Sequence, residues 1–331
     1  MKSILGIGNA LTDILAVLPD DEFLQKYHLP KGSMQHVDME TGDKIWSTLK
    51  KEVGVRYVAG GSAANTITCT AIFGMPSGFI GKIGDDELGH LFKSDQEQYG
   101  VNTRLLKGKN SSGRSMVFIT GANAERTFAV YLGAALELVP EDLKPEYFQG
   151  YDYFHIEGYL VQNQELIRTA VKMAKEAGCI ISIDMASYNV VESNDAFLHN
   201  IVDEYVDIVF ANETEAKVFT KKEPREALDE IARHCKIAVV KVGKDGSMVK
   251  SGDEYHFIEP WPAATIDATG AGDTYAAGFL YAHSLGMPLK VCGEIGSIIA
   301  AKVVEVIGTK IDIPRWRAAK QEIRELIAQN Q

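Results

Sequence analysis

An acidic side chain follows two closely spaced glycines in residues 267–273, which read Asp-Ala-Thr-Gly-Ala-Gly-Asp. A strand-like approach over 263–266 precedes this stretch, and the small residues of 274–280 predict a helix after it. The glycines would then lie where a loop opens a helix, and the unpaired N–H groups there suit a phosphate. Asp273 falls in the first helical turn, where it could accept a proton from an alcohol that attacks the bound phosphoryl group. The same position also favours an acidic residue through the helix dipole alone, which is the structural alternative.

These seven residues resemble the signature of the ribokinase-like carbohydrate and nucleoside kinases, the PfkB family. The resemblance implies that Asp273 is the catalytic base and that the amides of Gly270, Ala271 and Gly272 form an anion hole. Ala268 stands where the family usually has Thr, a change that does not touch the chemistry. The resemblance also implies ATP and Mg²⁺ as cofactors. The family often needs K⁺ near the anion hole, and Asp267 and Thr269 could border such a site.

A second group of polar residues would face the acceptor substrate. Asn9 and Asp13 follow an apolar segment, and residues 60–65 read Gly-Gly-Ser-Ala-Ala-Asn. By resemblance, Asp13 accepts hydrogen bonds from two sugar hydroxyls, and Asn65 bonds another while Gly60 and Gly61 pass close to the sugar. An ionised carboxylate accepts two hydroxyls at once, and an amide both donates and accepts, so the residue types suit a polyol. A loop carboxylate and a helix-packing Asn are the alternatives.

Two further motifs follow apolar segments in the C-terminal half. Residues 212–215 read Asn-Glu-Thr-Glu and resemble the family's Asn-x-x-Glu motif, which implies that Asn212 lies near ATP and that Glu215 reaches Mg²⁺ through water. Glu in a first helical turn is again the structural alternative. Residues 241–246, with Lys241, Gly243 and Gly246, resemble a loop that lies along ATP, although a glycine turn alone is a weak signal.

A small lid over the acceptor is expected from two segments, about 13–59 and 108–133. Met34 and His36 would be lid residues near the substrate, and two strand-like runs, 114–120 and 126–132, predict a hairpin. By resemblance to nucleoside kinases, Arg126 lies near the transferred phosphate and balances charge in the transition state. A solvated hairpin arginine is the other interpretation.

The rest of the chain predicts a doubly covered sheet. Apolar strand-like runs alternate with helical patterns from residue 150 onward, which is typical of a parallel sheet with helices on both faces. The expected fold is ribokinase-like three-layer α/β/α, with a mostly parallel central sheet and a small β lid, in a single domain over 1–331. Four widely spaced cysteines predict neither a disulfide framework nor a zinc site.

Charge and hydropathy narrow the class of partner. The net charge is −11, without a Lys/Arg block, so we expect no nucleic-acid partner. Neither a signal peptide nor an apolar run long enough for a membrane span is expected, which favours a cytoplasmic protein with a small-molecule substrate. The oligomeric state, monomer or homodimer, cannot be predicted.

The sequence leaves the acceptor open. The lid segment 29–38 and the Arg126-Thr127 pair look more like the adenosine kinase branch of the family than like ribokinase. Met34, Phe128 and Leu132 could form an apolar slot for a base. We therefore expect transfer to the hydroxymethyl group of a nucleoside or sugar, with adenosine favoured. Alternatives are a ribokinase- or fructokinase-type sugar kinase, a catalytically silent nucleotide-binding protein, and an NAD-dependent oxidoreductase. The last is disfavoured because Leu11 stands where a dinucleotide fingerprint would have a glycine.

Overall fold

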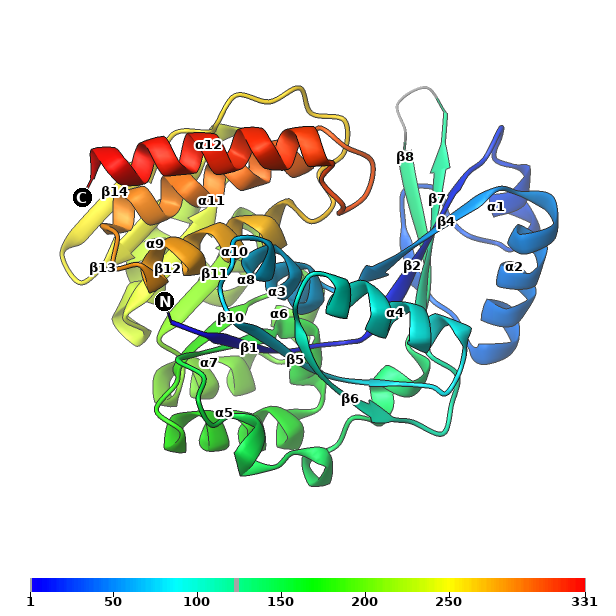
Figure 1. Ribbon diagram of the computed structural model, residues 1–331, viewed down its shortest axis with the longest axis horizontal. Coiled ribbons are helices and arrows are strands. Elements are labelled where there is room, and N and C mark those ends of the chain that lie inside the picture. The colour runs from blue at the N-terminus through cyan, green and yellow to red at the C-terminus, as the bar shows by residue number, and fades with distance from the viewer. Residues whose placement is uncertain (1, 122–124, 331) are drawn as a thin grey trace.

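The computed structural model describes residues 2–121 and 125–330, and it contains two sheets of different size (Figure 1). The larger sheet has the strand order β14-β13-β12-β11-β10-β9-β1-β5-β6. Pairing is parallel throughout except at one edge, where β13 pairs antiparallel with both β12 and β14. The strands are β1 (Ile4–Ile7), β5 (Ser77–Ile83), β6 (Asn102–Lys107), β9 (Tyr153–Glu157), β10 (Ile180–Asp184), β11 (Ile208–Asn212), β12 (Ile237–Lys241), β13 (Ser247–Ser251) and β14 (Glu254–Ile258).

Helices cover both faces of this sheet, because its central strands are apolar on both sides. In β1, Leu5 and Ile7 face one buried cluster, whereas Ile4 faces the other. The first layer has α5 (Gln164–Glu176), α6 (Tyr188–Ser193), α7 (Asp195–Glu204), α8 (Glu213–Thr220) and α9 (Pro224–His234). The second has α3 (Ser62–Ile72), α4 (Glu87–Gln98), α10 (Ala271–Ser284), α11 (Leu289–Val303) and α12 (Ile313–Gln329).

The smaller sheet is the lid, with the order β3-β8-β7-β2-β4. Its strands are β2 (Leu11–Val17), β3 (Met34–His36), β4 (Val55–Gly60), β7 (Gly113–Thr120) and β8 (Glu125–Tyr131). One face packs on α1 (Glu22–Lys26) and α2 (Met39–Glu52) through a cluster that includes Ile14, Ile45 and Phe118. The chain passes from β1 into β2 within three residues, so the acceptor side of the main sheet continues directly into the lid.

The predicted three-layer α/β fold with a lid is confirmed, and one local expectation was wrong. Residues 263–266 are not strand-like: they form an exposed loop without a strand partner, because the sheet already ends at β14. The antiparallel β13–β14 edge was not predicted, since its turn signal gives no indication of strand direction. The turn expected at 121–125 lies partly outside the described residues. The four cysteines are free, and no helix of the described residues is long and apolar enough to cross a membrane.

Candidate active site

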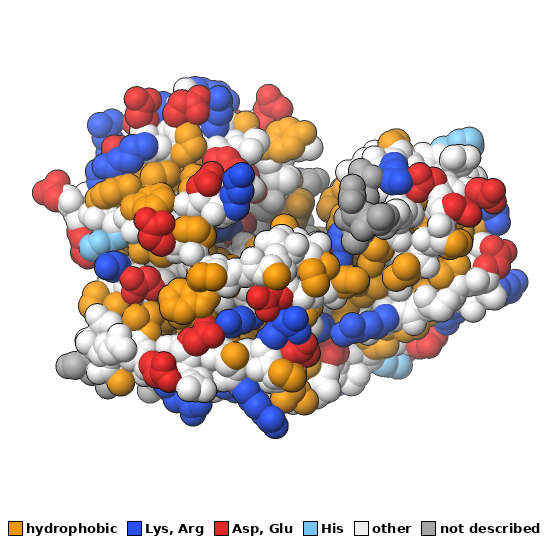
Figure 2. Space-filling view, turned by 90° about the horizontal axis from the view of Figure 1, so that it is seen from above, with side chains coloured by type: hydrophobic (Ala, Val, Ile, Leu, Met, Phe, Trp, Pro, Cys, Tyr) orange, Lys and Arg blue, Asp and Glu red, His pale blue; other side chains and the backbone are white. Residues whose placement is uncertain are grey.

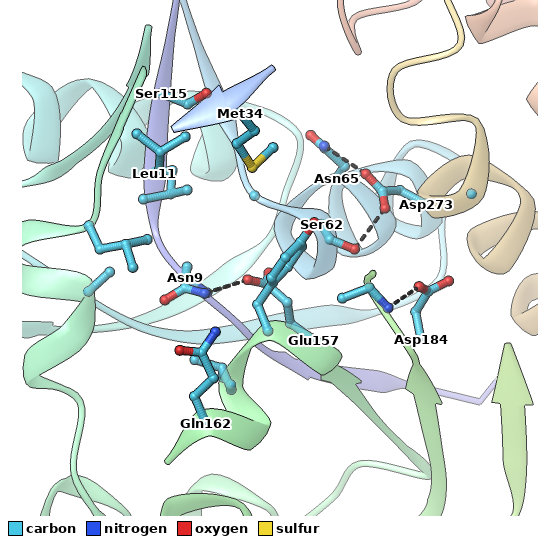
Figure 3. Close-up of a pocket in the computed structure, with 18 of the residues that line it drawn as sticks. Asn9, Leu11, Met34, Ser62, Asn65, Ser115, Glu157, Gln162, Asp184 and Asp273 are labelled. Carbon is cyan, nitrogen blue, oxygen red and sulfur yellow. Dashed lines mark hydrogen bonds between the residues drawn. The ribbon is translucent and has the colours of Figure 1, made fainter. Parts of the chain in front are cut away.

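A cavity of about 380 Å³ lies where the carboxyl ends of β1, β9, β10, β11 and β12 meet the lid and the start of α10. Figure 2 shows the molecule hollowed between the lid and the larger part of the chain, and Figure 3 shows side chains that line the cavity. Open parallel sheets bind ligands at this edge, and the volume falls within the range of roughly 300–1,000 Å³ typical of small-molecule sites.

The start of α10 reaches this cavity at Gly272 and Asp273, whereas Gly270 and Ala271 are not among the lining residues. Gly270 precedes the helix with φ 77°, a left-handed conformation that favours glycine, and it packs on Thr309. The Ala271 N–H is already used, since it donates to the Ala268 carbonyl at 3.2 Å. The amides of Gly270 and Gly272 are therefore the stronger candidates for binding an anion. A Cβ on Gly272 would lie 3.0 Å from Lys241 Nζ, so a glycine keeps this approach open.

Asp273 is held by α3, as Figure 3 shows. Ser62 Oγ donates to one carboxylate oxygen at 2.7 Å, and Asn65 Nδ2 donates to the other at 2.9 Å. Burial raises the pKa of Asp273 to about 6, although these two hydrogen bonds oppose the shift. Asp273 is thus an oriented carboxylate that is mostly ionised at neutral pH. Asn65, predicted to bond a substrate hydroxyl, donates one of its two amide hydrogens to this carboxylate.

A buried ion pair lies beside the amides of α10. Lys241 Nζ donates to Asp184 Oδ2 at 2.8 Å, and both side chains are at most 15% exposed. Burial opposes the charged forms, but their attraction keeps the pKa of Asp184 below and that of Lys241 above its ordinary value. Both residues therefore remain charged at neutral pH. The Lys241 ammonium adds positive charge where a phosphate would meet Gly272.

Asn212 and Glu215 form a capping box at the start of α8. The Glu215 carboxylate accepts from the Asn212 N–H at 2.8 Å and from its Nδ2 at 2.6 Å, and it is 2% exposed. Burial and the nearby Asp184 charge raise the pKa of Glu215 to about 7. Both residues line the cavity, but the hydrogen bonds of Glu215 match the structural alternative. A water-mediated role for it at Mg²⁺ stays a prediction.

The acceptor side of the cavity contains Asp13, placed by β2. A Cβ on Gly60 would lie 2.4 Å from the Asp13 carboxylate, so only glycine leaves room for it. Burial raises the pKa of Asp13 to about 7, with Lys310 opposing the shift. Hydroxyl donors would stabilise the ionised form of this carboxylate.

Glu157, at the end of β9, is a site residue that the sequence reasoning missed. Its carboxylate accepts from the N–H and Nδ2 of Asn9, at 3.3 and 2.6 Å, and from the Ala63 N–H at 3.0 Å. It therefore joins the end of β1 to the start of α3, beside Gly61. Burial raises the pKa of Glu157 to about 7. The available signal was a single acid at the end of an apolar strand, which also describes Asp184.

One lobe of the cavity is apolar. It is bounded by the lid, by residues 135–138 and by the turn after β9, and Gln162 lies in its wall (Figure 3). Met34 and His36 from β3 line the cavity from the lid side, as predicted from the sequence. The other apolar lining residues of this lobe are Leu11, Phe128, Val130, Leu132, Ala135, Leu136, Leu138, Leu160 and Leu166. Of the apolar residues, Met34, Phe128 and Leu132 were predicted from the sequence.

Several predicted residues do not line the cavity. Gly243 and Gly246 form the turn after β12, and Arg126 contacts Asp267 and Thr269 rather than the cavity. Of Arg126, Asp267 and Thr269, only Thr269 lines the cavity. The predicted residues Gly60, Gly270 and Ala271 do not line it either. The resemblance suggested that Asp267 and Thr269 could border a K⁺ site, and in this structure the Arg126 guanidinium contacts both residues.

Comparison with known protein families shows the family to which the chain belongs. The profile described as pfkB family carbohydrate kinase matches residues 34–316. The chain belongs to the pfkB family. Its members transfer a phosphoryl group, and this chain is accordingly a phosphotransferase whose substrate is a small molecule.

Three relatives illustrate the breadth of the family. A probable sugar kinase from Rhizobium etli is similar in structure, with 32% identity, TM-score 0.87 and coverage of 97% of this chain and 98% of that one. An adenosine kinase from Sinorhizobium meliloti has 33% identity and TM-score 0.86 over 97% and 99% of the two chains. A 5-dehydro-2-deoxygluconokinase from Clostridium beijerinckii is 29% identical over 84% of this chain and 86% of its own length.

Proposed function

We propose that this pfkB-family enzyme is an ATP- and Mg²⁺-dependent nucleoside kinase that phosphorylates the hydroxymethyl group of the ribose, with adenosine as the favoured acceptor. The observation that carries the proposal is the apolar lobe. It opens from the same cavity as Asp13 and Asp273, so a ribose between these carboxylates could extend a flat apolar group into it. A free pentose would leave the apolar side chains of this lobe in contact with water, whereas the base of a nucleoside would cover them, which is favourable.

The adenosine kinase among the relatives supports this choice, whereas the gluconate-derived acceptor of the other relative needs different groups. A sugar acid carries a carboxylate, which requires a cation or several donors when it is buried. Of the described lining residues, Lys241 is the only Lys or Arg, and it is paired with Asp184 on the phosphate side. The lobe itself offers aliphatic side chains. A neutral, planar acceptor group therefore fits better than an anionic one.

Gln162 supports adenine among the possible bases. A primary amide has one donor and one acceptor face, which match the amino group and a ring nitrogen of adenine. Gln162 lies in the wall of the lobe, in the turn Gly158–Gln162 that follows Glu157. This placement is suited to reading the edge of a base whose ribose lies near Asp13.

In the proposed mechanism, Asp13 accepts hydrogen bonds from the ribose hydroxyls. Glu157 holds the end of β1 and the start of α3 in place. Asp273 takes the proton from the attacking hydroxyl, while the Gly270 and Gly272 amides and Lys241 stabilise charge on the transferred phosphoryl group. ATP supplies that group, and Mg²⁺ neutralises charge on its phosphates. The described residues contain no cluster of three or more His, Cys, Asp or Glu able to hold a metal. The ion would therefore be held mainly by phosphate and water, with Glu215 nearby.

The experiment is a coupled assay of ADP release with ATP and a panel of nucleosides, pentoses, hexoses and sugar acids. We expect the highest kcat/KM with adenosine, and identification of the product as the 5′-monophosphate. A preference for ribose or fructose over every nucleoside would support the sugar kinase alternative. ATP binding without turnover of any acceptor would support a catalytically silent nucleotide-binding protein.

A further inference from the structure

An ion pair joins the lid to the loop that precedes α10. Arg126 lies in β8, and its guanidinium contacts the Asp267 carboxylate and donates from Nη1 to Thr269 Oγ1 at 3.2 Å. The two charged side chains are only 10% and 4% exposed. Removing one partner of a shielded pair leaves a buried charge without compensation, so each side chain depends on the other.

The Asp267 carboxylate also holds together the two segments that support the start of α10. One oxygen accepts from the Thr269 N–H at 3.0 Å, and the other accepts from the Gly308 N–H at 2.7 Å. Thr309, the next residue, packs against Gly270 at the left-handed turn into the helix. The position of the amides in the anion hole therefore depends on the Asp267 carboxylate, whose paired cation in this structure is the Arg126 guanidinium.

The arrangement does not fit the K⁺ ion that the sequence resemblance suggested. One Asp267 oxygen is shared by Gly308 and Arg126, the other accepts from Thr269, and the Thr269 hydroxyl accepts from Arg126. A monovalent cation at Asp267 would have to displace the guanidinium or lie against it. Two positive charges in such close contact, away from water, repel strongly.

We propose that Arg126 is a positioning residue that supplies the positive charge needed by Asp267, in place of a monovalent cation. Because Arg126 belongs to the lid, the loop before α10 reaches its working geometry only when the lid covers the cavity. Phosphoryl transfer is thereby coupled to lid closure, and the enzyme does not need K⁺. The inference rests on the phosphotransferase activity of the family and on these contacts, and it is independent of which acceptor is used.

The first test uses the unmodified protein. ADP release is measured in KCl and in choline chloride at equal ionic strength, and the melting temperature is recorded in both salts. We expect turnover to differ by less than about twofold and the melting temperature to be unchanged. Activation by K⁺ of more than about fivefold would overturn the proposal. The melting measurement needs no acceptor, so its result holds even if the nucleoside assignment fails.

The second test removes the guanidinium. In Arg126→Ala we expect turnover to fall about 10- to 100-fold, as for a misplaced catalytic group, with partial recovery in KCl or millimolar guanidinium chloride. Deuterium exchange in peptides covering 266–272 and 304–309 should rise. Arg56→Ala, which removes an exposed lid arginine in β4, should leave both unchanged. If Arg126→Ala fails to fold, Arg126→Gln serves instead. Unchanged exchange together with no response to added cations would refute the proposal.

Discussion

The substitution Asp273→Asn removes the charge of the proposed base without moving the side chain. In the structure one Asp273 oxygen accepts from Ser62 Oγ at 2.7 Å and the other from Asn65 Nδ2 at 2.9 Å. An Asn in the same rotamer can keep both contacts, because its oxygen accepts from Asn65 and its Nδ2 donates to the Ser62 hydroxyl. The substitution therefore removes the proton acceptor while the first turn of α10 stays in place.

The size of the effect follows from the role. General-base catalysis contributes about 10²- to 10⁴-fold, so we expect kcat to fall by at least about 10²-fold, which corresponds to about 2.7 kcal/mol in activation free energy. The KM for the acceptor should change little. The pKa of about 6 means that Asp273 is mostly ionised at pH 7.5, so nearly all wild-type molecules are competent there.

The substitution should also change stability in a pH-dependent way. The pKa of Asp273 is raised from 3.8 to about 6 in the folded protein, so stability is present while the carboxyl is protonated and is lost as the pH rises through about 6. At pH 8 the ionised group disfavours folding by up to about 3 kcal/mol, less where cavity water screens it. Ligand-free Asp273→Asn should thus be more stable than wild type at pH 8, with the difference vanishing near pH 4.

The assay is steady-state ADP release between pH 5 and 9, with urea unfolding at pH 4 and pH 8 as the stability measurement. At saturating acceptor, wild-type kcat should decline below a pH of about 6, and the residual kcat of the variant should lack this decline. Ser62→Ala is the matched control, because it removes one hydrogen bond but keeps the carboxylate. Wild-type turnover in Asp273→Asn, with an unaltered pH profile, would refute the assignment of the base.

Three further predictions concern other parts of the cavity. Lys241→Met should lower kcat about 10²-fold or more by removing charge beside the transferred phosphoryl group, and steady-state kinetics showing only a change in acceptor KM would contradict this. Glu157→Gln loses one oxygen acceptor for the Asn9 and Ala63 amides, so acceptor KM should rise about tenfold. Because its pKa is raised to about 7, the loss of stability from pH 5 to pH 8, followed by urea unfolding, should be shallower in the variant. Gln162→Leu should lower kcat/KM for adenosine about tenfold while sparing purine riboside, which lacks the amino group; equal losses for both would argue against base reading.

Local patterns were sufficient to predict the turn that opens α10 and the acid that follows it. Gly270 marks a left-handed turn that favours glycine, and Gly272 and Asp273 follow it within one helical turn, so their proximity is encoded over a few residues. The alternation of apolar strands and amphipathic helices likewise predicted the layered sheet.

The tertiary structure decided which distant side chains meet. Glu157 joins two segments nearly 150 and 94 residues away, Lys241 pairs with Asp184 across 57 residues, and Arg126 reaches Asp267 from the lid. Each residue alone is an ordinary charged residue at a strand end or in a hairpin. Sequence alone determined the motif chemistry because it depends on neighbours along the chain. Charge pairing and the apolar lobe depend on strand order and on how the lid meets the main sheet, and these arise only when the chain packs.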